Sequence, residues 1–317
     1  MKIIDLKEGK EVHNTDAPLC LALGNFDGVH RGHRALIKMA VEEGRKNGLK
    51  TGIWTFADHP MNTLCASRVS YLTSNLEKNE IFAESGLDYV IYEEFSAVRD
   101  MAPQEFAKKI LVEGLDCRIA VCGFNFRFGR RGLGDAECLQ GLMTDMGRRA
   151  ITLPPVTVNG KAVSSTAIRQ LIEEGDTEGA AELLGRPYSV TLPVIYGKQL
   201  GRTLGLPTIN QRLEGDRVTP KKGVYVSVCH IDGKRLPAVS NIGCRPTVND
   251  NGNDVNCETH IIGYEGSLYG QCVKVSFYSK LRDEVRFCGV EELKKAVEND
   301  VLAAEKYFFE RKGLLKK

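Results

Sequence analysis

Two histidines three residues apart, His30 and His33, are the side chains of this sequence best placed for chemistry. They follow an apolar run and a glycine-rich turn, and apolar residues at helical spacing come next, so we expect them at a helix N-terminus. Residues three apart lie on one face of a helix, and its N-terminus offers free N–H groups and a positive dipole end. Two imidazoles there could bind a phosphate and stabilise developing negative charge.

A buried strand and a helix must position this pair. The apolar run over residues 19–23 predicts the strand, and the apolar residues at positions 36, 37, 40 and 41 predict the helix. Gly32, between the two histidines, would let a ligand approach the backbone closely. The alternative is a buried helix start whose two histidines make ordinary hydrogen bonds.

A second group of phosphate-binding side chains is expected at Ser164, Ser165, Thr166 and Arg169. Ser164 or Ser165 is a suitable N-cap for a helix that continues through residues 168–172. The hydroxyl groups would lie at its N-terminus and the guanidinium one turn further on, which suits a phosphate. A capped helix without a ligand is the alternative. No G-x-x-x-x-G-K-[ST] string occurs in the sequence, which excludes a P-loop.

Composition indicates a globular protein of two domains. The chain has 317 residues, of which 42% are hydrophobic and 26% charged, with a net charge of +2. This small charge predicts no nucleic-acid partner, and no segment is apolar enough for a signal peptide or a membrane span. The ten cysteines form no C-x-x-C pair. We therefore expect reduced thiols in a cytoplasmic protein without a membrane partner.

The first half of the chain alternates strand and helix patterns. Besides the run at residues 19–23, strands are expected at residues 52–56, 88–92 and 119–122, with helical patterns between them. Such alternation predicts a mostly parallel, doubly wound sheet. Ligands of these sheets bind at the carboxyl ends of the strands, where the motifs of this half lie.

The second half begins after Gly185-Arg186-Pro187, where the pattern changes. Strand candidates then follow one another with Gly and Asn turns between them, at residues 189–196, 223–230, 236–242, 258–264 and 271–278. This succession predicts an antiparallel barrel or sandwich. An amphipathic helix over residues 290–308 closes the chain.

Three polar residues of the second half lie on expected extended segments. Thr208 and Asn210 could supply two oxygen ligands to Mg²⁺ from an extended segment after a proline. An Asx-type turn explains them equally well. Glu258 lies on a candidate strand, where a single glutamate usually faces solvent.

These motifs resemble those of the bacterial bifunctional riboflavin kinase/FMN adenylyltransferase (FAD synthetase) family. Residues 24–33, G-N-F-D-G-V-H-R-G-H, are similar to its long form of the nucleotidyltransferase H-x-G-H motif. Residues 163–169 resemble the S-S-T-x-I-R motif of the same superfamily. Residues 204–210 resemble the riboflavin kinase G-x-P-T-A-N motif, and residues 257–260 its E-T-H strand. The resemblance covers nearly the whole chain, with the motifs in the expected order.

The resemblance implies a Rossmann-like nucleotidyltransferase domain with a parallel sheet over residues 1–185. It implies an antiparallel β-barrel riboflavin kinase domain with a closing helix over residues 186–317. The implied reactions are phosphorylation of riboflavin to FMN by ATP, and adenylylation of FMN by ATP to FAD with release of pyrophosphate. Mg²⁺ would be the cofactor, and riboflavin, FMN and ATP the small-molecule partners. A monomer or weak homo-oligomer is expected.

The resemblance also implies roles for individual residues. His30 and His33 would be catalytic in adenylyl transfer, and Glu258 would accept the proton of the riboflavin 5′-hydroxyl. The implied nucleotide-binding residues are Gly24, Phe26, Asp27, Gly32, Asn125, Ser164, Ser165, Thr166, Arg169, Gly197, Gly201 and Arg202. The implied flavin-binding residues are Asn125, Arg245 and Arg282, and the implied metal ligands are Thr208 and Asn210. Residues 72–78 also resemble a family segment, to which we assign only a structural role.

Three positions depart from the family patterns. Asp58 stands where proline is usual, Leu200 where a basic residue is usual, and Ile209 where alanine is usual. Two rival interpretations follow. A related adenylyl- or cytidylyltransferase with another acceptor would explain the histidine pair but not the second half. A flavin-binding regulatory protein with an inactive kinase half would explain the departures.

Overall fold

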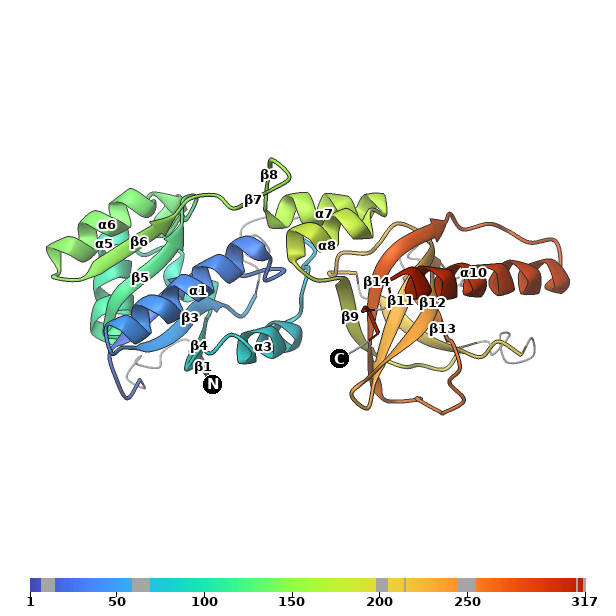
Figure 1. Ribbon diagram of the computed structural model, residues 1–317. Helices are drawn as coiled ribbons and strands as arrows, with labels where there is room; N and C mark the ends of the chain where they lie inside the picture. Colours follow the sequence, from blue (N-terminus) through green and yellow to red (C-terminus); the bar gives the residue numbers. More distant parts are fainter. Residues whose placement is uncertain are drawn as a thin grey trace. The chain divides into compact units, whose positions relative to one another are not determined.

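The computed structural model describes residues 1–6, 15–58, 69–197, 205–213, 215–244, 255–311 and 313–315. The chain divides into two compact units, Met1–Ser165 and Thr166–Lys317 (Figure 1). Each unit has its own sheet. Among the helices described, none combines the length and the apolar character that crossing a membrane requires.

A six-stranded parallel sheet forms the centre of the first unit. In spatial order its strands are β1 (Lys2–Leu6), β4 (Tyr89–Glu93), β3 (Lys50–Phe56), β2 (Leu19–Leu23), β5 (Cys117–Gly123) and β6 (Arg149–Leu153). Every neighbouring pair in this sheet is parallel, which confirms the predicted α/β architecture. The chain order reverses at β2, because β3 lies on one side of it and β5 on the other. The carboxyl end of β2 is therefore at the topological switch point, where ligands of such sheets bind.

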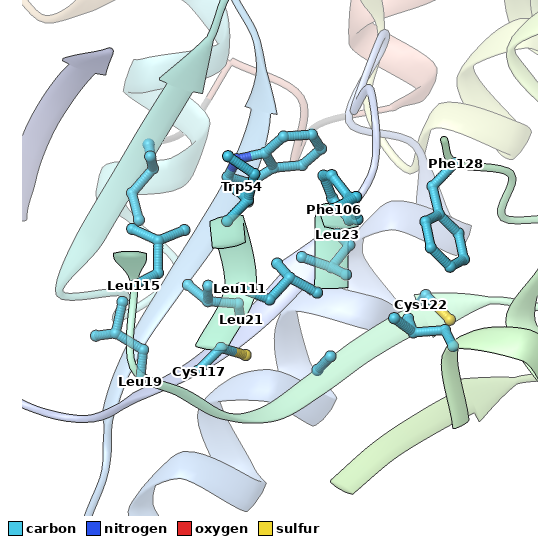
Figure 2. Close-up of a cluster of buried hydrophobic side chains, with 14 of the residues drawn as sticks. Leu19, Leu21, Leu23, Trp54, Phe106, Leu111, Leu115, Cys117, Cys122 and Phe128 are labelled. Carbon is cyan, nitrogen blue, oxygen red and sulfur yellow. The ribbon is translucent and has the colours of Figure 1, made fainter. Parts of the chain in front are cut away.

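Helices cover both faces of this sheet because β2 is apolar on both sides. Leu19, Leu21 and Leu23 point to one face, where they pack with Phe106 and Leu111 (Figure 2). The intervening residues of β2 point to the other face and pack with apolar residues of α1 and α3. In the part of this unit that the structure describes, the helical segments are α1 (Arg31–Lys46), α3 (Asn75–Ala83), α4 (Phe95–Val98), α5 (Pro103–Glu105), the π-helical η1 (Phe106–Gly114), the 3₁₀ turn η2 (Arg130–Gly132) and α6 (Ala136–Asp145). A small antiparallel pair, β7 (Thr157–Val158) and β8 (Lys161–Ala162), follows the sheet.

The second unit is an antiparallel sheet of six strands. In spatial order they are β10 (Thr208–Leu213), β13 (Val255–Ile261), β12 (Lys234–Cys244), β11 (Gly223–Ile231), β14 (Cys272–Arg282) and β9 (Tyr188–Pro193). The sheet curls until its edges meet, because Ile195, just after β9, forms an antiparallel bridge with Asn210 of β10. Helix α10 (Val290–Glu310) packs Ala304 and Phe308 against β11, β12 and β14. The predicted barrel-type sheet with a closing helix is thus confirmed.

Two short helices precede this sheet, α7 (Ser165–Glu174) and α8 (Thr177–Leu184). The Thr177 hydroxyl donates to the backbone carbonyl of Tyr278 at 3.0 Å, and the Ser279 hydroxyl donates to the Glu178 carboxylate at 3.3 Å. The N–H of Lys221 donates to the carbonyl of Ile172 at 3.1 Å. These bonds attach both helices to the second unit. The domain boundary expected between residues 185 and 186 stays a prediction.

Candidate functional site

Strand β2 ends in a tight turn that carries the first motif. Phe26 has φ 53° and Val29 has φ 37°, a left-handed region that residues with a Cβ rarely adopt and that is costly for a β-branched side chain. Both side chains are fully buried. The Phe26 ring packs 5.1 Å from the His33 ring and 6.0 Å from the Phe82 ring, measured between centroids. Burial of these apolar groups offsets the backbone cost and fixes the turn beside the histidines.

His30 and His33 lie together where α1 begins. Their rings stack with centroids 3.6 Å apart and 12° between their planes. His30 caps the helix, because its Nδ1 accepts the backbone N–H of His33 at 3.2 Å. A neutral His30 with an accepting Nδ1 carries its proton on Nε2, from which it can donate to a phosphate oxygen. The first turn of α1 carries no acidic residue and includes Arg31 and Arg34, which favours an anion.

Gly32 makes room for an aromatic ring, whereas a side chain at Gly24 would make only an ordinary contact with one. A Cβ on Gly32 would lie 3.2 Å from two atoms of the His30 imidazole, so a side chain there would press on this ring. A Cβ on Gly24 would lie 3.4 Å from the Phe26 ring. The glycine between the histidines is therefore explained by the packing of His30. The expected approach of a ligand to its backbone, and the nucleotide contacts of Gly24, Phe26 and Gly32, stay predictions.

Asp27 turns its carboxylate into the protein. The side chain is buried, and it accepts the backbone N–H groups of Leu72 at 2.8 Å and Thr73 at 3.3 Å. The Ser165 hydroxyl donates to the backbone carbonyl of Asp27 at 2.9 Å. Ser165, the last residue of the first unit, is thus bonded to the turn after β2. A direct contact of Asp27 with the nucleotide stays a prediction.

The other expected nucleotide ligands lie on α7 and after β5. Ser164 precedes the first residue of α7, in the N-cap position, whereas Thr166 and Arg169 follow on the helix in the second unit. Asn125 is exposed on the turn after β5. Because β5 runs parallel to β2 beside it, Asn125 lies at the same edge of the sheet as the histidine turn. Behind it, Phe128 is buried and stacks on Phe126 with 5.6 Å between ring centroids, which gives these aromatic rings a packing role.

Glu93, at the carboxyl end of β4, is an acidic residue in an apolar setting that the sequence analysis did not single out. Its side chain is buried. Burial raises the pKa of Glu93 to about 7, and the neighbouring Glu94 carboxylate adds to the rise. The backbone N–H of Glu94 and the indole of Trp54 oppose it in part. The signal in the sequence is a pair of carboxylates, Glu93 and Glu94, that ends an apolar run.

We expect Glu93→Gln to stabilise the first unit at neutral pH but not in acid. In the unfolded chain this carboxyl ionises near pH 4.5, and in the folded chain near pH 7. Stability therefore falls as pH rises between these values, since only the unfolded state releases the proton there. A neutral Gln avoids this loss, so its melting temperature should exceed that of the parent by a few degrees above pH 7 and match it near pH 4.5.

Trp54 fluorescence measures this unfolding, because it is the only tryptophan in the sequence and lies buried in the first unit. Glu84→Gln, at an exposed position of the same unit, is the matched control and should show no such dependence on pH. If Glu93→Gln raised the melting temperature by the same amount near pH 4.5 and above pH 7, this result would contradict the raised pKa of Glu93.

Residues expected to act in phosphoryl transfer meet on two neighbouring strands of the second unit. Asn210 on β10 pairs directly with Glu258 on β13, and Glu258 pairs on its other side with Asn241 of β12. Directly opposed residues have their side chains on the same face of a sheet, and Thr208, two residues from Asn210, shares it. Asn210 is buried and Glu258 is half-buried. The register thus brings together the predicted base and both predicted metal ligands, and adds Asn241.

Gly197 lies against this face. A Cβ on Gly197 would come within 2.6 Å of the Asn210 amide, so a side chain there would displace this amide. Next to it, Tyr196 is 72% exposed and stacks on Tyr269, which is 36% exposed, with 4.2 Å between ring centroids. Such an exposed aromatic pair could pack on a planar ring. Nothing in the sequence pattern distinguished Tyr196 from a core tyrosine.

Arg282 makes a two-point ion pair with Asp300 of α10, at 3.0 Å from Nε and 2.7 Å from Nη2. Its Nη1 donates to the backbone carbonyl of Asp283 at 3.2 Å. These bonds give Arg282 a part in holding α10 on the sheet, and its flavin contact stays a prediction. Three other expected ligands, Gly201, Arg202 and Arg245, lie outside the described residues. Leu200, which departs from the family pattern, lies outside them too.

The parallel unit has a histidine pair at its switch point, and the barrel has Thr208, Asn210 and Glu258 on one face, which together indicate a two-unit transferase that uses nucleotides. The family model described as FAD synthetase matches residues 12–167, and the one described as riboflavin kinase matches residues 184–308. The chain belongs to the bifunctional riboflavin kinase/FMN adenylyltransferase family. It is an enzyme that phosphorylates riboflavin to FMN and adenylylates FMN to FAD, with ATP as co-substrate.

Similar proteins support this over nearly the full length. The bifunctional riboflavin kinase/FMN adenylyltransferase of Escherichia coli K12 is 37% identical, with 94% of this chain and 96% of that protein covered. The protein of the same description from Listeria monocytogenes is 35% identical over 93% and 94% of the two chains. A solved structure described as a macrolide-efflux protein from Streptococcus pneumoniae has the same fold, with a TM-score of 0.85, 27% identity, and 96% and 98% of the two chains covered.

Proposed function

We propose that the two reactions are divided between the two motif sets, with adenylyl transfer at the histidine turn and riboflavin phosphorylation at the Asn210–Glu258 face. The observation that carries the proposal is the strand register, which opposes Asn210 to Glu258 although 48 positions separate them. A solvated strand glutamate and an Asx turn, the alternatives for these residues, would not require this pairing.

In adenylyl transfer, a phosphate oxygen of FMN attacks the α-phosphorus of ATP, and pyrophosphate leaves with the electrons of the broken P–O bond. No covalent enzyme intermediate is needed. His30, which can donate from Nε2, and His33 would stabilise the negative charge that develops on the phosphate oxygens. The hydroxyl groups of Ser164 and Ser165, at the end of the first unit, would help to hold the triphosphate in line for attack.

In riboflavin phosphorylation, Glu258 would accept the proton of the 5′-hydroxyl as its oxygen attacks the γ-phosphorus of ATP. Thr208 and Asn210 would hold Mg²⁺, which neutralises charge on the phosphates when it is bound. Their neutral oxygen ligands fit a metal bound largely through substrate phosphates. The described residues contain no cluster of three His, Cys, Asp or Glu side chains that could hold a metal unaided.

We also propose that the enzyme is cytoplasmic and that it is a monomer or weak homo-oligomer. The described cysteines are free thiols, in keeping with a reducing compartment. Burial raises the pKa of several of these thiols, Cys257 to about 11, which makes them poor nucleophiles.

A fragment of residues 166–317 tests the division of labour. We expect it to fold, to make FMN from riboflavin and ATP in the presence of Mg²⁺, to lose this activity with a chelator, and to make no FAD. A fragment of residues 185–317 should be less stable to urea. It loses the bonds of Thr177 and Glu178 and the buried Leu183 and Leu184, each leucine worth about 1.5–3 kcal/mol.

Chromatographic separation of the flavin products and urea unfolding followed by circular dichroism give the two results. A folded fragment of residues 166–317 without kinase activity under Mg²⁺ would show that phosphorylation needs the first unit. FAD formed by either fragment would contradict the assignment of adenylyl transfer to the histidine turn. Equal urea midpoints for the two fragments would show that α7 and α8 add nothing to the stability of the barrel.

A further inference from the structure

The turn after β2 is held by a short segment that precedes α3. The Thr73 hydroxyl accepts the backbone N–H of Gly28 at 2.9 Å, while the Asp27 carboxylate accepts the backbone N–H of Thr73 at 3.3 Å and of Leu72 at 2.8 Å. Both side chains are buried. The side chain of Thr73 therefore bonds to Gly28 and its backbone bonds to Asp27, two consecutive residues of the turn. Thr73 lies 45 and 46 positions after these residues in the sequence.

This turn needs such support because its backbone is strained on both sides of these bonds. Phe26 precedes them and Val29 follows them, both with positive φ. A non-glycine residue keeps this conformation only where the surroundings fix it. The next residue, His30, caps α1 and stacks on His33, so any relaxation of the turn moves the imidazole pair.

The supporting segment is itself held by hydrogen bonds at the start of α3. Ser74 and Glu77 form a reciprocal capping box at the start of α3, immediately after Thr73. One turn into this helix, Lys78 is buried; burial lowers the pKa of its ammonium group, and the negative charges of Asp27 and Asp58 oppose this shift. The opposite charges of Lys78 and Asp27 attract each other, which favours the position of α3 beside the turn.

We propose that Thr73 is a positioning residue for adenylyl transfer. Its hydroxyl holds the Gly28 backbone so that His30 and His33 keep the orientation that stabilises the transferring phosphoryl group. This role rests on the function proposed above for the histidine pair. It goes beyond the structural role that the sequence suggested for residues 72–78, because it makes the rate of one reaction depend on one hydroxyl group.

Thr73→Val tests the proposal, since it removes the hydroxyl and keeps the volume and the β-branch. We expect kcat for FAD formation to fall by about 10- to 100-fold, the range for a small misplacement of reacting groups. The KM values for FMN and ATP should change much less, and riboflavin phosphorylation by the same sample should be unchanged. Thr73→Ser, which keeps the hydroxyl, should restore kcat to within about threefold of the parent.

Thr51→Val is the matched control for stability. Thr51 is buried on β3, where its hydroxyl donates to Asp88 at 3.1 Å, at the end of the strand away from the histidine turn. The two valine variants should lower the Trp54 melting transition to a similar degree, but only Thr73→Val should slow FAD formation at a temperature where both are folded. Equal slowing by Thr51→Val would mean that general loss of stability is responsible, and the positioning role would be wrong.

Two further results would also overturn the proposal: a Thr73→Val variant with the parental kcat, or a Thr73→Ser variant as slow as Thr73→Val. Failure of the underlying function is detected separately with His33→Ala. If His33→Ala retains FAD formation, the histidine pair is not catalytic. If His33→Ala is inactive while Thr73→Val is not, the error lies in the role given to Thr73.

Discussion

His33→Ala is expected to lower FAD formation from FMN and ATP by about 10²–10³-fold or more, while the same sample still converts riboflavin to FMN. Loss of one preorganised group that stabilises transition-state charge typically has this effect. The substitution removes the imidazole that stacks on His30, but the backbone N–H of residue 33 can still donate to His30 Nδ1. Helix α1 should therefore remain capped, and the loss should appear in the chemical step.

Lys38→Ala provides the control on the same helix. Lys38 is exposed, and its 3.8 Å ion pair with Glu42 lies on the solvent side of α1. Both activities of this variant should match the parent, because surface pairs of this kind contribute little to stability. Chromatographic separation of FMN and FAD measures the two reactions in one sample. An equal loss of both activities in His33→Ala would contradict the division into two sites.

The architecture was predictable because burial leaves a direct mark on the sequence. An uninterrupted apolar run such as residues 19–23 is typical of a parallel strand covered on both faces, and β2 is buried at all five positions. The helical spacing after His33 likewise predicted α1, whose buried residues include Leu36, Ile37, Ala40 and Val41. Periodicity gives the type of element and its buried face, and here these were sufficient for the fold class.

Contacts between distant residues were beyond the reach of periodicity. Nucleotide binding by Asp27 stays a prediction, and its carboxylate accepts N–H groups from residues 45 and 46 positions later, which the sequence did not indicate. Arg282 was expected to bind flavin, and its guanidinium pairs with Asp300 on a different element. A sequence motif indicates that a charged residue has a functional or structural role. Only the packing of separate elements shows which group it meets.

The stack of Tyr196 on Tyr269 was missed for the same reason, since it joins the chain after β9 to the loop before β14. Strand register, in contrast to these side-chain contacts, could be connected directly to the sequence motifs. It could not be read from the sequence, yet once observed it grouped Thr208, Asn210 and Glu258 without further assumption, because directly paired residues share a face. This grouping is the main support that the structure adds for a kinase site at these residues.

Glu258→Gln is expected to lower riboflavin phosphorylation by about 10²–10⁴-fold, the usual contribution of a general base. Gln keeps the size and hydrogen-bonding capacity of the side chain between Asn210 and Asn241, so the strand pairing should survive and only the proton acceptor is lost. FMN supplied externally should still be converted to FAD at the parental rate.

Glu298→Gln makes the same chemical change at an exposed position of α10 and should leave both activities unaltered. Initial rates of FMN formation at saturating riboflavin and ATP then separate two explanations of a slow Glu258→Gln enzyme. A fall in kcat with nearly unchanged KM values indicates loss of a group that acts in the transition state, whereas a rise in KM alone indicates loss of substrate binding. A near-parental kcat would show that another group accepts the proton of the 5′-hydroxyl and that Glu258 serves the pairing of β10, β13 and β12.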